Sequence, residues 1–142
     1  MKEDYCSFEI SKLLKEKGFD GLCYTYYPRG VKDKYNISML ADNHNKHSET
    51  SRPTLQMAMK WLRKKHNIDI EIDANVGMLG IKVYTPFIST YKSVTDNTNK
   101  LRQYKRGLHY KDDKGVVPAL QHFSTHEEAV EAALKYCLTE LI

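Results

Sequence analysis

The N-terminal part of the chain combines a helical spacing of apolar residues with a glycine stop. Apolar side chains recur at three- and four-residue intervals over residues 6–17, which predicts an amphipathic helix. These side chains are Cys6, Ile10, Leu13 and Leu14. Gly18 is placed to end the helix in the left-handed conformation, and Phe19 follows as the apolar residue that often accompanies such a cap.

The same order of helix, cap and strand returns in the middle of the chain. Pro53 suits the first turn of a helix that we expect to end at His66. The apolar stripe of this second helix consists of Leu55, Ala58, Met59 and Leu62, with Trp61 at one exposed edge. Asn67 can take the left-handed cap position. Ile68, Ile70 and Ile72 then alternate with Asp69, Glu71 and Asp73, which predicts a strand with one buried and one wet face.

Four further segments read as strands. Residues 22–27 are rich in aromatic residues and end before Pro28, and residues 35–40 alternate as a returning hairpin strand. Residues 81–84 predict a strand that ends at Pro86. Residues 116–123 predict a last strand, and Pro118 within it favours a position at a sheet edge. The polar segment 41–51 reads as a loop.

The C-terminal segment specifies a third helix. Thr125 and Glu128 have the spacing of a capping box, in which each side chain bonds a backbone N–H at the helix start. Behind it, apolar residues recur at helical spacing. They are Ala129, Val130, Ala133, Leu134, Cys137, Leu138 and Leu141.

This order of elements predicts an α+β fold. With 142 residues the chain has the length of one domain. Helices and strands alternate only loosely, which favours a mostly antiparallel sheet over a doubly wound parallel one. We therefore expect a single domain over 1–142, with three to five strands covered by three helices.

Composition places the chain among soluble globular proteins, since 41% of residues are hydrophobic and 28% are charged. The N-terminus has no apolar signal region and no segment is long enough to span a membrane, so a cytoplasmic location without membrane partners is expected. Cys6, Cys23 and Cys137 form no C-x-x-C pair, and we expect buried, reduced thiols.

The long segment 89–115 is the main functional lead. It shows no sustained periodicity, so it reads as a loop or insertion. It carries seven basic and three acidic residues, an excess equal to the chain's whole net charge of +4. The basic residues are Lys92, Lys100, Arg102, Lys105, Arg106, Lys111 and Lys114; the acidic ones are Asp96, Asp112 and Asp113. Tyr91, Tyr104, His109 and Tyr110 lie among them.

Cations interleaved with aromatic rings suit binding of nucleic acid or a small nucleotide. Lys60, Arg63 and Lys64 form a ridge on the second helix that could complete one anion site with this segment. A solvated loop and a solvated helix face explain the same charges.

Other chemistry has weak sequence support. His44 and His47 lie near Asp42 and Glu49, but a flexible loop without a third fixed ligand is poor support for a metal site. No hydrolase, phosphate-loop or dinucleotide motif occurs. Asp69, Glu71 and Asp73 could bind a divalent cation or supply acid–base groups, but the wet face of an antiparallel sheet explains them without further assumptions. We expect a protein that is not an enzyme and uses neither a cofactor nor a metal.

Two segments carry motifs that can be compared with other sequences. In Pro53–Ile72 a Trp-Leu-Arg helix leads into an isoleucine-alternating strand, and Phe123–Leu134 contains a Glu-Ala-x-Glu-Ala helix. Both motifs resemble those of a group of small uncharacterised proteins from phages and prophages of gut bacteria. The resemblance implies a setting, namely a small accessory protein of a mobile element. Our leading hypothesis is a non-enzymatic binding protein that engages a host protein through protein–protein contacts. A polyanionic ligand is the alternative partner, and a homodimer through the Trp61 edge or the Pro118 strand is a further option.

Overall fold

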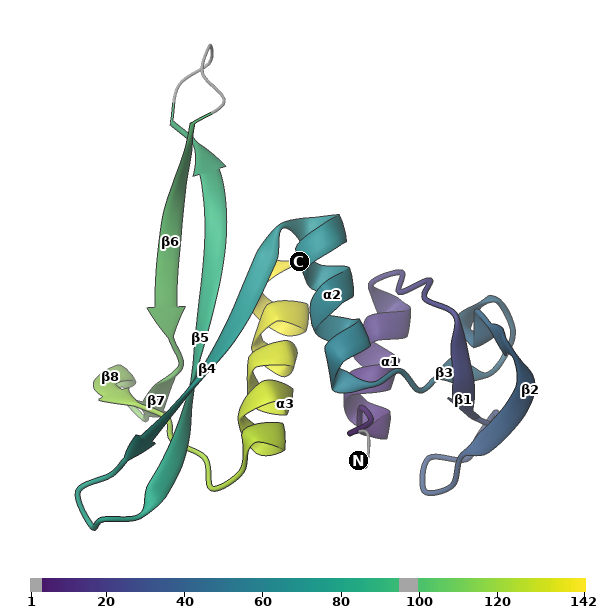
Figure 1. Ribbon diagram of the computed structural model, residues 1–142, viewed down its shortest axis with the longest axis horizontal. Helices are drawn as coiled ribbons and strands as arrows, with labels where there is room; N and C mark the ends of the chain where they lie inside the picture. Colours follow the sequence, from purple (N-terminus) through teal and green to yellow (C-terminus); the bar gives the residue numbers. More distant parts are fainter. Residues whose placement is uncertain (1–3, 95–99) are drawn as a thin grey trace. The chain divides into compact units, whose positions relative to one another are not determined.

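The computed structural model describes residues 4–94 and 100–142 (Figure 1). Its helices are α1 (Phe8–Glu16), α2 (Leu55–His66) and α3 (His126–Tyr136), with a short 3₁₀ turn η1 (His44–Lys46) and a π turn η2 (Cys137–Leu141). Its strands are β1 (Cys23–Tyr27), β2 (Asn36–Asp42), β3 (Thr50–Ser51), β4 (Ile68–Val76), β5 (Lys82–Ser93), β6 (Leu101–Gly107), β7 (His109–Asp112) and β8 (Gly115–Leu120).

The predicted α+β class with antiparallel pairing is confirmed. The described strands form three sheets, with the orders β2-β1-β3, β4-β5-β6 and β7-β8. The chain contains two compact units: unit 1 comprises Met1–Trp61 and Leu134–Ile142, and unit 2 comprises Leu62–Ala133. That both units belong to one domain stays a prediction.

Unit 1 builds its small sheet around β1. Both β2 and β3 pair with β1 in antiparallel fashion, so β2 is an edge strand. A shift in the β1–β2 register between Cys23 and Thr25 marks a bulge. The N-terminal segment also pairs with the residue before α2, through a bridge between Tyr5 and Thr54. The core of this unit contains Ile10, Leu14, Phe19, Leu55, Ala58, Leu134 and Leu138.

Unit 2 centres on β5, which pairs with β4 along nine residues and with β6 along seven. As predicted, Ile68 is buried while Glu71 and Asp73 are exposed. Directly opposite residues of an antiparallel pair share a face, so the register places the isoleucines of β4 with Ile88 and the acidic residues with Ser89. The core contains Leu62, Ile68, Ile88, Leu108, Ala129, Val130 and Ala133.

The prediction of a loop over 89–115 is wrong in the described part of that segment. β5 continues to Ser93, β6 covers Leu101–Gly107, and the β7–β8 ribbon begins at His109. The exposed strand β6 alternates polar side chains on both faces, so it lacks the apolar periodicity by which a strand is recognised. Residues 95–99, which include Asp96, lie outside the described residues.

The prediction that a strand ends at Pro86 is also wrong, because β5 passes through this proline. Tyr84 exchanges both backbone hydrogen bonds with Phe123 on the side of β5 away from β4. Alternate residues of a strand point their N–H groups to the same side. An N–H at position 86 would therefore point away from β4, to the side on which Tyr84 bonds Phe123. β6 stops pairing at Gly107, opposite Phe87, and therefore needs no donor from Pro86.

The predicted helix caps are confirmed in large part. Gly18 and Asn67 both have positive φ, at 90° and 53°, as the left-handed cap requires. At the start of α3, the Glu128 N–H donates to the Thr125 hydroxyl at 3.1 Å. The Glu128 carboxylate accepts a long 3.4 Å hydrogen bond from the Ser124 hydroxyl, so Ser124 takes part in the cap together with Thr125.

The expectation of an exposed Trp61 edge is wrong. The Trp61 side chain is buried, and its ring meets the Phe19 ring edge-on at 5.7 Å. Phe19 directly follows the Gly18 cap, so the cap positions the ring that covers Trp61. The three cysteines are buried thiols, as predicted.

Candidate binding surfaces

Three of the predicted basic residues, Arg102, Lys105 and Arg106, lie on β6 and divide between its two faces. Arg102, Tyr104 and Arg106 share one face, because alternate strand residues do. Lys92 of β5 lies opposite Arg102, and its ammonium group is 5.5 Å from the centre of the Tyr104 ring. This face of β6 thus combines an exposed tyrosine ring with basic side chains. That it binds an anion stays a prediction.

Lys105 lies on the opposite face of β6 and is already paired. Its ammonium group donates to the Glu71 carboxylate at 2.8 Å. The hydrogen bond to Glu71 is the main cause that raises the pKa of Lys105 above its ordinary value. Glu71 therefore competes with any polyanion for this cation.

The other predicted site residues lie on other elements. Lys100 immediately precedes β6 and is exposed. His109 and Tyr110 belong to β7, in the separate β7–β8 ribbon. Lys60, Arg63 and Lys64 are exposed on α2. Their participation in one anion site with β6 stays a prediction.

A different surface, which sequence reasoning missed, lies on unit 1. The edge strand β2 exposes three large apolar side chains: Ile37 at 72%, Met39 at 97% and Leu40 at 79%. Leu22 and Tyr24, beside and on β1, are exposed as well. Natural edge strands are usually protected by charges or proline, and β2 carries no charge before Asp42. Alternation with polar residues made this strand look half-buried in the sequence.

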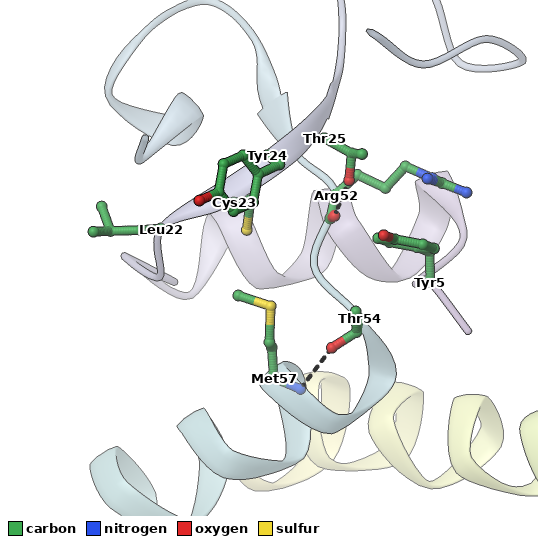
Figure 2. Close-up of a pocket in the computed structure, with 8 residues that line it drawn as sticks. All are labelled: Tyr5, Leu22, Cys23, Tyr24, Thr25, Arg52, Thr54 and Met57. Carbon is green, nitrogen blue, oxygen red and sulfur yellow. Dashed lines mark hydrogen bonds between the residues drawn. The ribbon is translucent and has the colours of Figure 1, made fainter. Parts of the chain in front are cut away.

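A cavity of about 270 Å³ opens next to β1 in the same unit (Figure 2). In Figure 2 the Met57 side chain rises from α2 toward Cys23 and Tyr24 on β1. Apolar surface dominates the lining, and the polar side chains among the lining residues carry hydroxyl groups and one guanidinium group. The lining residues are Tyr5, Leu22, Cys23, Tyr24, Thr25, Arg52, Thr54 and Met57.

Arg52 is held at the border of this cavity by two aromatic rings. Its guanidinium carbon lies 4.2 Å from the centre of the Tyr5 ring and 3.7 Å from that of Tyr35, both within cation–π distance. The backbone fixes its position, because Arg52 and Thr25 exchange a backbone hydrogen bond and a hydroxyl–carbonyl bond. Within residues 4–94 and 100–142, no carboxylate forms an ion pair with Arg52.

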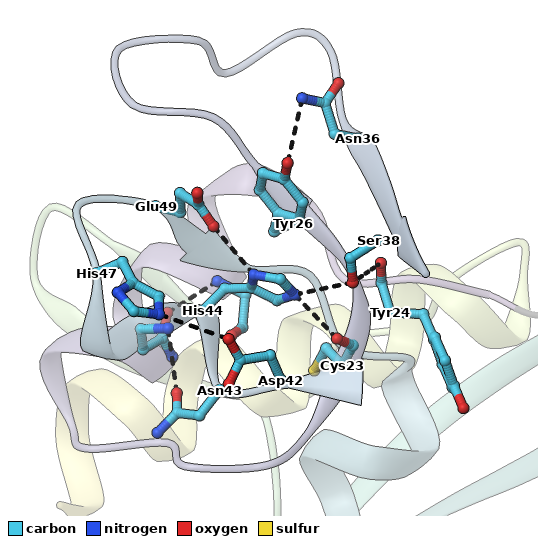
Figure 3. A network of polar contacts seen from close by, with 12 residues as sticks. Cys23, Tyr24, Tyr26, Asn36, Ser38, Asp42, Asn43, His44, His47 and Glu49 are labelled. Atoms are coloured by element: carbon cyan, nitrogen blue, oxygen red, sulfur yellow. Dashed lines mark hydrogen bonds and ion pairs between the residues drawn. The ribbon is translucent and has the colours of Figure 1, made fainter. Parts of the chain in front are cut away.

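A buried histidine braces β2 against β1 (Figure 3). The His44 Nδ1 atom lies 3.0 Å from the Glu49 carboxylate, and Nε2 lies 3.0 Å from the Cys23 carbonyl oxygen and 3.5 Å from the Ser38 hydroxyl on β2. The Tyr26 ring stacks on the imidazole at 4.3 Å. Both ring nitrogens therefore have a hydrogen-bonding partner. These contacts hold the end of β2 in place.

The Cys23 thiol at the cavity is poorly disposed to act as a nucleophile. Burial raises the pKa of Cys23 from 9.0 to about 11, and a hydrogen bond with Ser51 acts in the opposite direction. The thiolate is the reactive form of cysteine. At neutral pH this thiol therefore serves as an apolar lining group.

Comparisons with known proteins give no relative: no family model, no curated protein and no solved structure matches the chain. None of the helices in the described part of the chain is long and apolar enough to cross a membrane. Across the described ranges, His, Cys, Asp and Glu side chains form no group of three that could hold a metal ion. The four loop residues considered for a metal site contact one another in two pairs, His44 with Glu49 and His47 with Asp42.

Proposed function

We propose that the protein is a non-enzymatic binding module, an accessory factor that holds an extended segment of a partner protein along β2 and the adjacent cavity. The observation that carries this proposal is the exposure of Ile37, Met39 and Leu40 on an unprotected sheet edge. An exposed strand edge offers unpaired N–H and C=O groups, and extended peptides bind such edges by adding a strand.

The cavity beside β1 can give the surface specificity for a particular side chain of the bound peptide, which an open strand edge alone does not provide. In strand addition, main-chain hydrogen bonds give affinity and neighbouring pockets give specificity. The cavity is apolar with a few polar groups, which is the composition of a site that buries one apolar part of a ligand. Its guanidinium group at Arg52 favours a segment with a carboxylate next to that apolar side chain.

The surface is also held in shape before a partner arrives. His44 fixes Ser38 of β2 against the Cys23 carbonyl of β1, and the two tyrosine rings hold Arg52. A surface that keeps its bound conformation when free loses less entropy on binding. This ordering supports a recognition role for the residues concerned.

The test is selection of peptides from a random displayed library on the immobilised protein, followed by fluorescence anisotropy. Selected peptides should bind the wild-type protein and lose at least about fivefold in affinity with Ile37→Lys and Met39→Lys. Val116→Lys is the matched control, since Val116 on β8 is a similarly exposed aliphatic residue. Hydrogen exchange of the β2 amides should slow when peptide binds. Peptide affinity that is unchanged by the β2 substitutions would refute this function.

A second function, recognition of a nucleic acid or small nucleotide, is favoured by the arrangement on β6. Arg102, Tyr104 and Arg106 share one face with Lys92 beside them. Aromatic rings flanked by cations stack on bases while the cations meet phosphates. Lys100, His109, Tyr110 and the α2 residues Lys60, Arg63 and Lys64 would extend such a site.

Mobility shifts with single- and double-stranded oligonucleotides at several salt concentrations test this second function. Binding should weaken steeply with salt and disappear when Arg102 and Tyr104 are replaced by Ser. A matched pair of substitutions at Lys12 and Lys32 of unit 1 should change it little. Absence of binding to either form of DNA and RNA at low salt would rule this function out.

A further inference from the structure

The turn between β4 and β5 is an apolar tip. Residues 76–81 read Val-Gly-Met-Leu-Gly-Ile and contain no polar side chain. Met78 is fully exposed and Leu79 is 88% exposed, with Val76 and Ile81 exposed beside them. Four large apolar side chains at one turn form a patch of the kind that marks an interaction site on a soluble protein.

The backbone presents this tip as a defined shape. The Gly77 N–H donates to the Ile81 carbonyl at 2.8 Å, and the Gly80 N–H donates to the Gly77 carbonyl at 3.0 Å. Gly80 has a positive φ of 74°, which is easily adopted only by glycine. Met78 and Leu79 are therefore held at the apex of a closed turn.

The tip also stands clear of its own sheet. Within the described strands, β6 pairs with β5 no further than Phe87, and Phe123 bridges β5 at Tyr84. Beyond Tyr84 only β4 and β5 continue, as the narrow hairpin in Figure 1 shows. A narrow two-stranded ribbon can enter a hollow that the whole sheet could not.

The cavity of unit 1 has the size and chemistry to receive this tip. A dry cavity of about 150 Å³ lined by aliphatic side chains holds one benzene molecule, so 270 Å³ accommodates the two apex side chains. Leu22 and Tyr24 give its rim exposed apolar surface, and Met57 gives an adaptable wall.

We propose that the hairpin tip of one copy, led by Met78 and Leu79, docks into the unit 1 cavity of a second copy. This inference goes beyond the proposed function, because it fills the cavity with a closed apolar turn and leaves the β2 edge unpaired. We call the tip around Met78 and Leu79 the knob and the unit 1 cavity the hollow. They are different parts of the chain, so the contact is heterologous. After one contact forms, one copy still has an unused knob and the other an unused hollow. Association is therefore head-to-tail and leads to rings or open chains.

Sedimentation velocity over a range of protein concentrations tests this contact. The wild-type protein should show a sedimentation coefficient that rises with concentration. A knob variant, Met78→Ser with Leu79→Ser, should remain monomeric, as should a hollow variant, Leu22→Asp with Tyr24→Asp. All four residues are exposed, so folding should be preserved. Val116→Ser is the matched control and should assemble like the wild type.

Mixing the two variants gives the sharpest result. The knob variant retains its hollow and the hollow variant retains its knob, so an equimolar mixture should form a heterodimer and stop there. A monomeric wild type at every concentration, variants that assemble normally, or a monomeric mixture would each overturn the proposal. Leu79-dependent binding to phosphatidylcholine vesicles without self-association would overturn it as well. Peptide selection on β2 has its own outcome, which separates failure of this contact from failure of the proposed function.

Discussion

Replacement of His44 by alanine should destabilise unit 1 and weaken its binding surface. The substitution removes the partner of the Glu49 carboxylate and of the Cys23 carbonyl, and it leaves the Tyr26 ring without its stacked neighbour. It also frees Ser38 on β2 from its contact with Nε2. Stability and peptide binding should therefore fall together.

The magnitude follows from the contacts that are lost. A hydrogen bond to a charged group contributes about 1.5–3 kcal/mol, and the lower value applies here because the Glu49 side chain is 31% exposed. The bond to the Cys23 carbonyl contributes about 1 kcal/mol more. A stacked ring pair adds about 0.5–1.5 kcal/mol. The free energy of unfolding should fall by about 3 kcal/mol, a substantial part of the 5–15 kcal/mol typical of a domain.

Urea unfolding followed by tryptophan fluorescence measures this loss, because Trp61 is the chain's one tryptophan and is buried in unit 1. His47→Ala is the matched control: the His47 side chain is 58% exposed and pairs with Asp42 at 3.5 Å, so it should cost under about 1 kcal/mol. Equal midpoints for the two variants would refute the bracing role of His44.

Three further predictions concern other elements. Burial raises the pKa of Cys23 from 9.0 to about 11. The thiol therefore ionises first in the unfolded chain, and the stability that it contributes below pH 9 should be lost as the pH rises to 11. At pH 8, Cys23 of the folded protein should react with iodoacetamide at least about 100-fold more slowly than Cys23 of the protein unfolded in urea, as peptide mass spectrometry can show. Glu71→Gln should release Lys105 for a polyanion and steepen the dependence of oligonucleotide affinity on salt by about one unit of slope, whereas an unchanged slope would mean that Lys105 does not meet phosphate. Asn67→Val should lower the free energy of unfolding by about 1–2 kcal/mol because a β-branched residue resists positive φ, while Asn67→Gly should not; equal costs by urea titration would contradict the cap.

Local signals in the sequence predicted much of the fold. The left-handed caps at Gly18 and Asn67 and the cap at Thr125 each depend on a few neighbouring residues, so the chain specifies them without tertiary context. The alternation of Ile68, Ile70 and Ile72 likewise identified β4. These patterns fix elements and leave open which strands pair.

The errors arose where pairing partners decide the outcome. Proline usually ends a strand because it has no N–H to donate. At position 86 no donor is needed, since β6 stops pairing with β5 at Phe87, and this is visible only in the structure. β6 is polar on both faces, and its pairing with β5 makes it a strand. Trp61 lies at the margin of its helical stripe, yet Phe19, which is distant in sequence, covers it.

The candidate site was predictable only in part. The β6 cations were found because segment 89–115 has more basic than acidic residues, which the sequence shows directly. The β2 surface was hidden because Ile37 and Met39 follow the same alternation as a buried strand, and periodicity does not tell a covered face from an uncovered one. The Arg52 environment joins Tyr5, Tyr35 and the end of β3, so no local motif announces it.

Pro86 has a consequence for the hydrogen-bond balance of the buried part of β5. The Pro86 side chain is less than 2% exposed, and neither neighbouring strand pairs with it on the side away from β4, because Phe123 bridges Tyr84 and β6 stops opposite Phe87. A backbone N–H at this position would therefore be buried without a strand partner, which costs about 1–3 kcal/mol. Proline has no N–H, so the strand passes through this gap between two pairing partners without leaving a buried donor unsatisfied.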